Sequence, residues 1–161
     1  MSDPFRILVV CLGNICRSPT AEALLRDRIE RSPLAGRVEV DSAGTGDWHV
    51  GHPPDPRTIK CAARHGVDIA HLRGRQITAR DLDSFDLVLC ADHANLRDVR
   101  ALTKGRDDHV ALLLDWSGVE GDSDVPDPYS GDAAGFERVW QLLSQAADGV
   151  VARLQRGLRP T

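Results

Sequence analysis

The stretch FRILVVCLGNICRSP, from Phe5 to Pro19, decides the fold of this chain. Its first part, Phe5 to Val10, is short and mostly apolar, which is typical of a strand buried on both faces of a sheet. The next part, Cys11 to Ser18, contains a glycine and an asparagine, which tolerate positive φ and predict a turn-like loop. Pro19 is acceptable in the first turn of a helix, where its missing N–H has no partner to lose. The stretch therefore predicts a strand, a loop and a helix in succession.

The rest of the chain continues this alternation. Helical spacing after Pro19 is seen at Ala21, Leu24, Leu25, Arg28 and Ile29. Further strands are predicted at residues 37–43, 85–90 and 109–114. Further helices are predicted at residues 57–65, from a cap at Asp92 to Leu102, and along the amphipathic C-terminal stretch 136–154. Two long loops, rich in Gly and Pro, are predicted at residues 44–56 and 114–132.

Alternating strands and helices predict an α/β protein. A chain of 161 residues fits one domain, so we expect a single doubly wound domain over residues 1–161. Its sheet should hold about four parallel strands flanked by helices. In such sheets ligands bind beyond the carboxyl ends of the strands. Cys11, Ser42 and Cys90 all fall at predicted strand ends, so this edge should hold the functional site.

The composition excludes several classes of function. With 20 basic and 24 acidic residues the net charge is -4, without the basic excess of nucleic-acid binders. No apolar run approaches the roughly 20 residues of a membrane helix, and no export signal is visible. We therefore expect a cytoplasmic protein that binds neither nucleic acid nor membranes. Its four cysteines should be reduced there, and they lack the CxxC spacing of zinc sites.

A candidate phosphate loop follows the first strand. Cys11 and Arg17 are separated by five residues, and Ser18 comes directly after. This pattern alone is common, but here it ends a buried strand and opens a helix. A loop of this kind can turn its N–H groups inward, and at the positive end of a helix dipole it binds a tetrahedral oxyanion. The residues assigned to phosphate binding are Leu12, Gly13, Asn14, Ile15, Cys16, Arg17 and Ser18.

Cys11 and Arg17 have complementary chemistry. The planar guanidinium of Arg17 can grip two phosphoryl oxygens at once. The same positive field favours the thiolate form of Cys11, to which Ser18 can donate a hydrogen bond. Cys11 is thus a candidate nucleophile and Arg17 a candidate phosphate clamp. The alternative, a buried strand-end cysteine near a surface charge, leaves the combination unexplained.

Three stretches resemble the low-molecular-weight protein tyrosine phosphatases. They are VCLGNICRSP at Val10–Pro19, SAGTGDWHVGHPPDPR at Ser42–Arg57, and Asp127-Pro128-Tyr129. The resemblance spans nearly the whole chain and implies a Rossmann-like, four-stranded parallel sheet. It also implies hydrolysis of phosphotyrosine and small aryl phosphates through a cysteinyl-phosphate intermediate, without metal or cofactor. The implied partners are tyrosine-phosphorylated proteins, and the expected state is a monomer or weak dimer.

Asp127 is the candidate general acid. Expelling a phenolate benefits from a proton donor behind the leaving oxygen. Asp127 lies in the second long loop, between Pro126 and Pro128, which stiffen its backbone. The resemblance puts the general acid at this residue. It also places Trp48 and Tyr129 as aromatic walls around the substrate ring.

Supporting roles also follow from the resemblance. Asn14 is expected to hold a left-handed backbone conformation with help from Ser42. A polar network is expected to contain His71, Glu22 and Asp41. Cys16 is expected to form a reversible disulfide with Cys11 that protects the nucleophile from overoxidation. The family often has a second Tyr after the Asp-Pro-Tyr tripeptide, but this chain has Ser130.

Other functions remain open. An arsenate reductase of the same fold needs two further relay cysteines, but none follows Cys90. A carrier phosphorylated on Cys11, or a phosphotyrosine-binding module, would have no need for Asp127. His49 and His52 have the spacing of metal ligands but lie in an irregular loop without an acidic partner, so no metal site is predicted.

Overall fold

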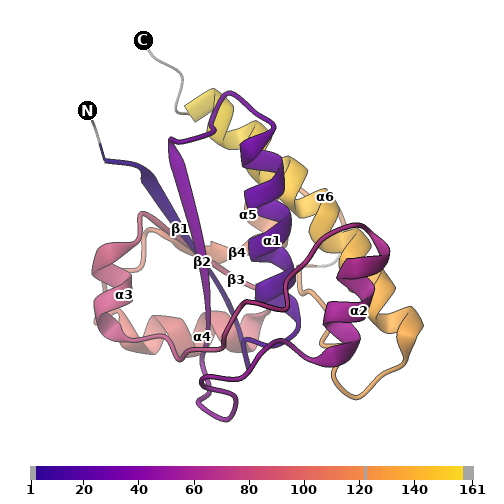
Figure 1. Cartoon of the computed structure of the whole chain (residues 1–161). Coiled ribbons are helices and arrows are strands. Elements are labelled where there is room, and N and C mark those ends of the chain that lie inside the picture. Colours follow the sequence, from indigo (N-terminus) through magenta and orange to yellow (C-terminus); the bar gives the residue numbers. More distant parts are fainter. Residues whose placement is uncertain (1–2, 122, 158–161) are drawn as a thin grey trace.

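A four-stranded parallel sheet forms the centre of the molecule. The computed structural model describes residues 3–121 and 123–157. The strands are β1 (Phe5–Cys11), β2 (Val38–Gly44), β3 (Leu87–Cys90) and β4 (Val110–Leu112), in the order β2-β1-β3-β4 (Figure 1). All three pairings are parallel. The predicted α/β class with four parallel strands is confirmed.

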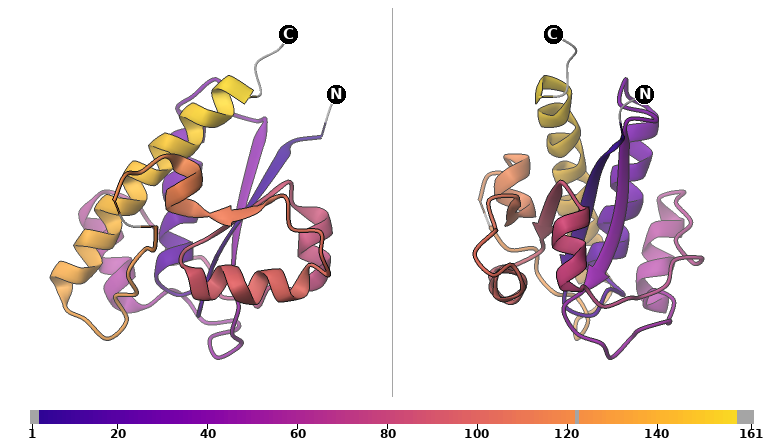
Figure 2. Two further views of the ribbon diagram at one scale, coloured as in Figure 1. Left: turned by 180° about the vertical axis from the view of Figure 1, so that it is seen from behind. Right: turned by 90° about the vertical axis from the view of Figure 1, so that its left-hand side faces the viewer.

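Helices cover both faces of this sheet. One face carries α1 (Arg17–Glu30), α2 (Pro56–Arg64), α5 (Leu113–Ser117) and α6 (Ala133–Gly157). The other face carries α3 (Ala79–Ser84) and α4 (His93–Leu102). The left view of Figure 2 shows the sheet between these two layers. The predicted doubly wound arrangement is therefore present.

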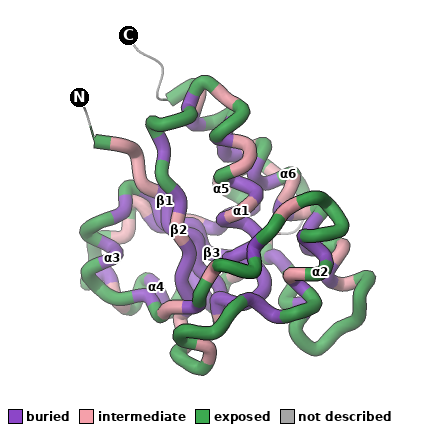
Figure 3. The backbone as a smooth tube through the Cα atoms, viewed as in Figure 1, coloured by how far each residue is buried: buried purple, intermediate pink, exposed green. Residues whose placement is uncertain are grey.

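Alternation along β1 divides the apolar core in two. Ile7 and Val9 belong to the cluster beneath α1 and α6, while Leu8 and Val10 belong to the cluster beneath α3 and α4. Each of these four side chains is at most 1% exposed. Figure 3 shows the buried strands at the centre and exposed segments around them. This explains why the run before Cys11 is continuously apolar.

The prediction for residues 109–132 is wrong in part. The expected strand at 109–114 is limited to β4, and α5 occupies the start of the expected loop at 114–132. β4 pairs with β3, whose last residue Cys90 lies opposite Leu112, so the ladder ends there. The apolar residues that follow are buried by forming α5 instead. This helix ends at Gly118, whose φ of 81° glycine adopts without strain.

The helix α3 is missing from the sequence-based assignment. Its first turn is fixed by a capping box: the Thr78 side chain accepts from the backbone N–H of Asp81, and the Asp81 side chain accepts from the backbone N–H of Thr78. The spacing Thr-x-x-Asp is the local signal that could have found it. The other predicted elements are present, with ends shifted by a few residues. In particular, α1 begins at Arg17, which leaves Pro19 in its first turn.

The strand order places the carboxyl end of β1 at the point where the chain connections reverse direction. β2 lies on one side of β1 and β3 on the other. A crevice forms at such a switch point, because the following helices cover opposite faces. Cys11 ends β1 at this crevice. Among the residues described, no helix combines the length and apolar character needed to cross a bilayer.

Candidate active site

The loop between β1 and α1 is anchored through its carbonyl groups. Backbone N–H groups of Thr45, Gly46 and Asp55 each donate over 2.9 Å to the carbonyl oxygens of Cys11, Leu12 and Ile15, respectively. Among the described residues, the N–H groups from Gly13 to Arg17 have no protein acceptor. Gly44 lets the loop pack closely, since a Cβ there would lie 2.7 Å from the oxygen of Leu12. The loop therefore keeps its donors available beside the first turn of α1.

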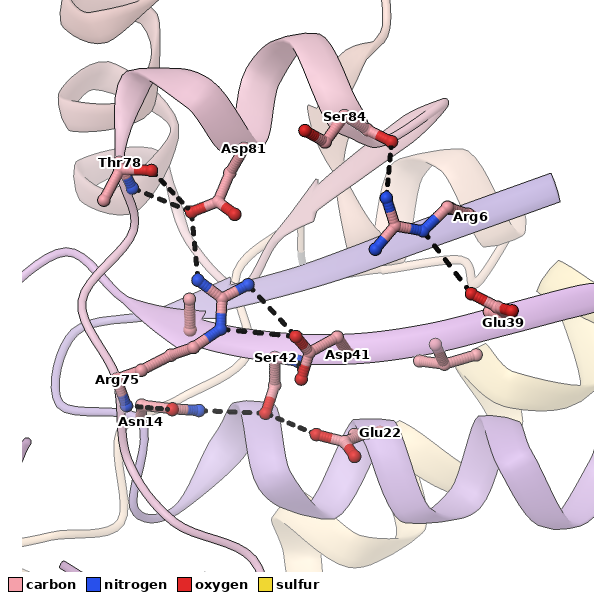
Figure 4. Close-up of polar contacts among 12 residues, drawn as sticks. Arg6, Asn14, Glu22, Glu39, Asp41, Ser42, Arg75, Thr78, Asp81 and Ser84 are labelled. Atoms are coloured by element: carbon pink, nitrogen blue, oxygen red, sulfur yellow. Dashed lines mark hydrogen bonds and ion pairs between the residues drawn. The ribbon is translucent and has the colours of Figure 1, made fainter. Parts of the chain in front are cut away.

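Asn14 shapes this loop from inside. It is 3% exposed and has φ 58°, in the left-handed region that asparagine tolerates. Its Nδ2 donates to Ser18 Oγ over 2.8 Å and to Ser42 Oγ over 3.0 Å. Its Oδ1 accepts from the backbone N–H of Arg75 over 3.0 Å. Asn14 thus joins β2, α1 and the segment before α3, as Figure 4 shows in part.

A polar network extends behind Asn14. Ser42 Oγ donates to Glu22 Oε1 over 2.6 Å, while Arg75 binds Asp41 over 3.1 Å and Asp81 over 3.0 Å (Figure 4). Burial raises the pKa of Glu22, and the Ser42 hydrogen bond opposes that shift. Sequence reasoning missed Arg75, which ties Asp41 into the network.

His71 lies outside these hydrogen bonds. The sequence groups it with Glu22 and Asp41, but its side chain is exposed. Within the described part of the chain it has no hydrogen bond, and its contact with Glu22 is electrostatic only. The structure therefore brings two of the three expected residues into the network and leaves the third at its margin.

Cys11 is buried against the loop that follows it. Its Sγ lies 3.0 Å from Ser18 Oγ, and Cys11 is only 3% exposed. The Ser18 oxygen accepts from Asn14 Nδ2, and the Ser18 hydroxyl has two acceptors within reach, the Cys11 sulfur and, over 3.5 Å, the Ala43 carbonyl. Cys16 lies in the same loop, and burial raises the pKa of its thiol to about 12.

Arg17 is held by three groups at the edge of the sheet. Its Nη1 donates to Asp92 Oδ2 over 2.6 Å and to the Val125 carbonyl over 3.0 Å. Its Nη2 lies 3.6 Å from Asp127 Oδ2. Burial alone would lower the pKa of Arg17, but the charges of Cys11, Asp92 and Asp127 outweigh burial and raise it. The guanidinium therefore stays charged.

Asp92 has a second role that the sequence did not reveal. Its Oδ1 caps α4 by accepting from Asn95 N, as the pattern predicts. Its Oδ2 binds Arg17, which is 75 positions away in the sequence. A capping pattern reports only the first contact, because it depends on residues a few positions apart.

Asp127 lies at the mouth of a pocket of about 140 Å³. Its side chain is 43% exposed, and its Oδ1 accepts from the backbone N–H of Tyr129 over 3.0 Å. Trp48 and Tyr129 line the same pocket and are 66% and 50% exposed. The pocket lining is Cys11, Leu12, Gly13, Ile15, Cys16, Arg17, Trp48, His49, Asp127 and Tyr129. Three distant segments thus meet at one site.

Arg57 connects the acid-bearing loop to α2, and sequence reasoning missed it. Its Nη2 donates to the Tyr129 carbonyl over 2.6 Å and to Asp55 Oδ2 over 2.9 Å. Its Nη1 donates to the carbonyl of Gly131 over 3.3 Å. Asp55 in turn bonds the phosphate loop at Ile15. Arg57 and Asp55 therefore link the segments that carry Cys11 and Asp127.

The remaining candidates lie apart from this chemistry or contribute to its walls. Cys90 is fully buried at the end of β3 and does not line the pocket. His49 lines the pocket, with its ring centroid 5.8 Å from that of His52 and 6.3 Å from that of Tyr129. Among the described residues, no third metal-ligating side chain joins the two histidines.

Comparison with known proteins finds relatives from one family. The profile described as low molecular weight phosphotyrosine protein phosphatase matches residues 6–159. The Bacillus subtilis low molecular weight protein-tyrosine-phosphatase YfkJ is 38% identical over 151 residues, covering 93% of this chain and 96% of that protein. The Streptomyces coelicolor low molecular weight protein-tyrosine-phosphatase is 41% identical over 155 residues, covering 94% of each chain.

Solved structures agree. The crystal structure of YfkJ superposes with a TM-score of 0.92 at 36% identity, covering 98% of this chain and 99% of YfkJ. Vibrio vulnificus Wzb, solved in complex with benzylphosphonate, gives a TM-score of 0.82 at 29% identity, covering 93% and 99%. The chain therefore belongs to the family of low molecular weight phosphotyrosine protein phosphatases. It is accordingly a hydrolase of the protein-tyrosine-phosphatase class.

Proposed function

We propose that the protein hydrolyses phosphotyrosine in proteins, and small aryl phosphates, in two steps through a cysteinyl phosphate on Cys11. The observation that carries this proposal is the meeting of Cys11, Arg17 and Asp127 at one pocket. They come from the end of β1, the start of α1 and the loop before α6. A thiol, a guanidinium and a carboxyl group in one pocket suit nucleophilic attack, anion binding and proton transfer.

In the first step, the sulfur of Cys11 attacks phosphorus and the bond to the phenolic oxygen breaks. The N–H groups from Gly13 to Arg17, which have no protein acceptor among the described residues, are available to the equatorial oxygens. Arg17 contributes its planar fork, held in place by Asp92 and the Val125 carbonyl. Such fixed donors stabilise the charge of the transition state without reorganising during the reaction.

Asp127 gives its proton to the departing phenolate oxygen and then takes a proton from water. That water attacks the cysteinyl phosphate, releasing inorganic phosphate and the free sulfur. The backbone N–H of Tyr129 donates to Oδ1 of Asp127 and so orients the carboxyl group. No metal or cofactor takes part in either step.

Trp48 and Tyr129 support an aromatic substrate. They line the pocket that holds Cys11 and leave large surfaces exposed at its mouth. Aromatic rings of this kind can sandwich a phenyl group. Wzb, whose fold this chain shares, was solved with benzylphosphonate, a phosphonate on a benzyl group. Tyrosine-phosphorylated proteins are therefore the proposed substrates.

Aryl phosphates with good and poor leaving groups test the mechanism. Cys11→Ser should abolish turnover and still bind vanadate. Asp127→Ala should slow poor leaving groups by about 10²–10⁴-fold, because general acid catalysis contributes about that factor, and good leaving groups far less. Asp124→Ala is the matched control: this nearby carboxylate pairs with His93 outside the pocket, so its rates should match the parent.

Two outcomes would count against the proposal. If Asp127→Ala slowed substrates with good and poor leaving groups equally, Asp127 would not be the general acid. Release of no more than one equivalent of phenol per chain would favour a phosphorylated carrier or a binding module. Arsenate reduction has less support, since Cys90 does not share the pocket with Cys11.

A further inference from the structure

A second group of reactive side chains lies where α2 packs against α6 (Figure 1). Cys61 lies in α2, His65 is the cap residue that follows this helix, and Glu137 lies near the start of α6. One ligand atom from each of these residues lies within 4.8 Å of the others. None of the three side chains lines the phosphate pocket or has a role in the mechanism above.

The distances within this group suit a shared metal ion. His65 Nε2 lies 2.8 Å from Oε1 and 3.0 Å from Oε2 of Glu137, and Cys61 Sγ lies 3.5 Å from Oε2. A tetrahedral zinc ion with bonds of about 2.0–2.3 Å sets neighbouring ligand atoms roughly 3.3–3.5 Å apart. The third pair, Cys61 Sγ and His65 Nε2, lies within 4.8 Å, so side-chain rotations that close this gap would bring all three ligands to one ion.

The surrounding structure holds the ligands in place. Cys61 and His65 are four residues apart, so helix geometry sets them on one side of α2. The His65 ring stacks on Trp140 with centroids 4.5 Å apart and planes 11° from parallel. Gln141 Nε2 donates to Glu137 Oε1 over 3.1 Å. Outer contacts of this kind orient metal ligands.

The charges also favour a cation. The Glu137 carboxylate, which lies 2.8 Å from His65 Nε2, brings negative charge to the group. Arg64 Nη2, 3.9 Å from Glu137 Oε2, is a competing cation. Its side chain is half-exposed.

We propose that Cys61, His65 and Glu137 form a site for a zinc-class divalent cation that clamps α2 to α6. Thiolate and imidazole select this class over magnesium and calcium, which prefer oxygen ligands. On binding, the thiol releases its proton to solvent, and sulfur, nitrogen and oxygen replace three waters of the ion. Thiolate and carboxylate together balance the two positive charges. The fourth position faces solvent, because His65 and Glu137 are partly exposed.

Cobalt titration of the full-length chain tests this site. The titration is made in a Cys11→Ser background, so that the proposed nucleophile cannot bind the metal. One equivalent of Co²⁺ should bind with a sulfur-to-cobalt charge-transfer band, and Zn²⁺ should displace it. Adding Cys61→Ser should abolish the band. Adding His65→Gln or Glu137→Gln should weaken binding by at least about tenfold, because even the outer contacts of metal ligands contribute about 10–100-fold to affinity.

His93→Gln is the matched control. His93 Nδ1 lies 2.6 Å from Asp124 Oδ1, so this pair resembles His65–Glu137 but has no thiol beside it. The His93→Gln variant should keep the sulfur-to-cobalt charge-transfer band and the affinity for Co²⁺. Zinc should also raise the unfolding temperature of the Cys11→Ser protein, and Glu137→Gln should remove that rise.

Several results would overturn the proposal. They are the absence of a charge-transfer band, a band that survives Cys61→Ser, and unchanged affinity in both His65→Gln and Glu137→Gln. If circular dichroism shows that Cys61→Ser is unfolded, the decision rests on the other two variants, which retain hydrogen-bonding side chains. The site lies apart from the phosphate pocket, so the metal-free hydrolysis proposed above stands or falls separately.

Discussion

Replacing Asn14 tests how the phosphate loop is kept in shape. This buried side chain makes three hydrogen bonds, to Ser18, Ser42 and the backbone of Arg75, at φ 58°. Three such bonds contribute about 3 kcal/mol together, at about 1 kcal/mol each. An ordinary L-residue in the left-handed region costs roughly 1–2 kcal/mol more.

Two substitutions separate these contributions. Asn14→Gly loses the hydrogen bonds but keeps the backbone conformation, so the free energy of unfolding should fall by about 3 kcal/mol. Asn14→Ala also adds backbone strain, so its free energy of unfolding should fall by about 4–5 kcal/mol. Both proteins should still fold, since small domains have about 5–15 kcal/mol in total. Urea unfolding measures these differences, and kcat with an aryl phosphate measures the effect on the loop.

Activity should fall in both variants. If only about 1.4 kcal/mol of the lost support is expressed in the transition state, kcat falls about tenfold. Lys104 provides the control, because it has φ 51° and is not among the residues that line the pocket. Lys104→Gly and Lys104→Ala should differ in stability through strain alone and leave kcat unchanged. The reasoning is refuted if both Asn14 variants lose less than about 1 kcal/mol, or if alanine is as stable as glycine there.

Two further predictions concern the other cysteines. Dithiothreitol should largely reverse peroxide inactivation in the parent protein but not in Cys16→Ser. Cys16 lines the pocket together with Cys11, so it can trap the oxidised sulfur of Cys11 as a disulfide. Equal recovery of activity in both proteins would contradict this role. Burial raises the pKa of Cys90 from 9.0 to about 12, so the folded protein holds this proton longer than the unfolded chain. The resulting stability is fully present below about pH 9 and is lost as pH rises toward about 12. Cys90→Ala should therefore flatten the alkaline decline in the free energy of unfolding, measured by urea titration; an unchanged slope would count against the shift.

Local patterns in the sequence were enough for the frame of the fold. The strand before Cys11, the loop and the helix from Arg17 follow from apolar runs and turn residues. The cap at Asp92 was found because its partner, Asn95, is three residues away. The Thr78–Asp81 capping box carried a local signal of the same kind that was not used.

Boundaries and long-range contacts needed the tertiary structure. The apolar run at residues 109–114 suits a strand or a buried helix, and the choice depended on where β3 ends. The pairing of Arg17 with Asp92, and of Arg57 with the Tyr129 carbonyl, joins segments far apart in the chain. No periodicity reports such contacts.

The sequence by itself determined which residues have the chemistry for a phosphate site, because a Cys, an Arg and a glycine-containing loop at a strand end carry that information locally. Only the tertiary structure decided what stands around them. Arg57 reaches the Tyr129 carbonyl from α2, and the backbone of Arg75 reaches Asn14 from the segment before α3, because helices packed on both sheet faces bring these segments to one edge. Likewise, Cys61 and Glu137 become neighbours only through the packing of α2 on α6. Packing depends on the whole apolar core, and no short stretch of sequence encodes it.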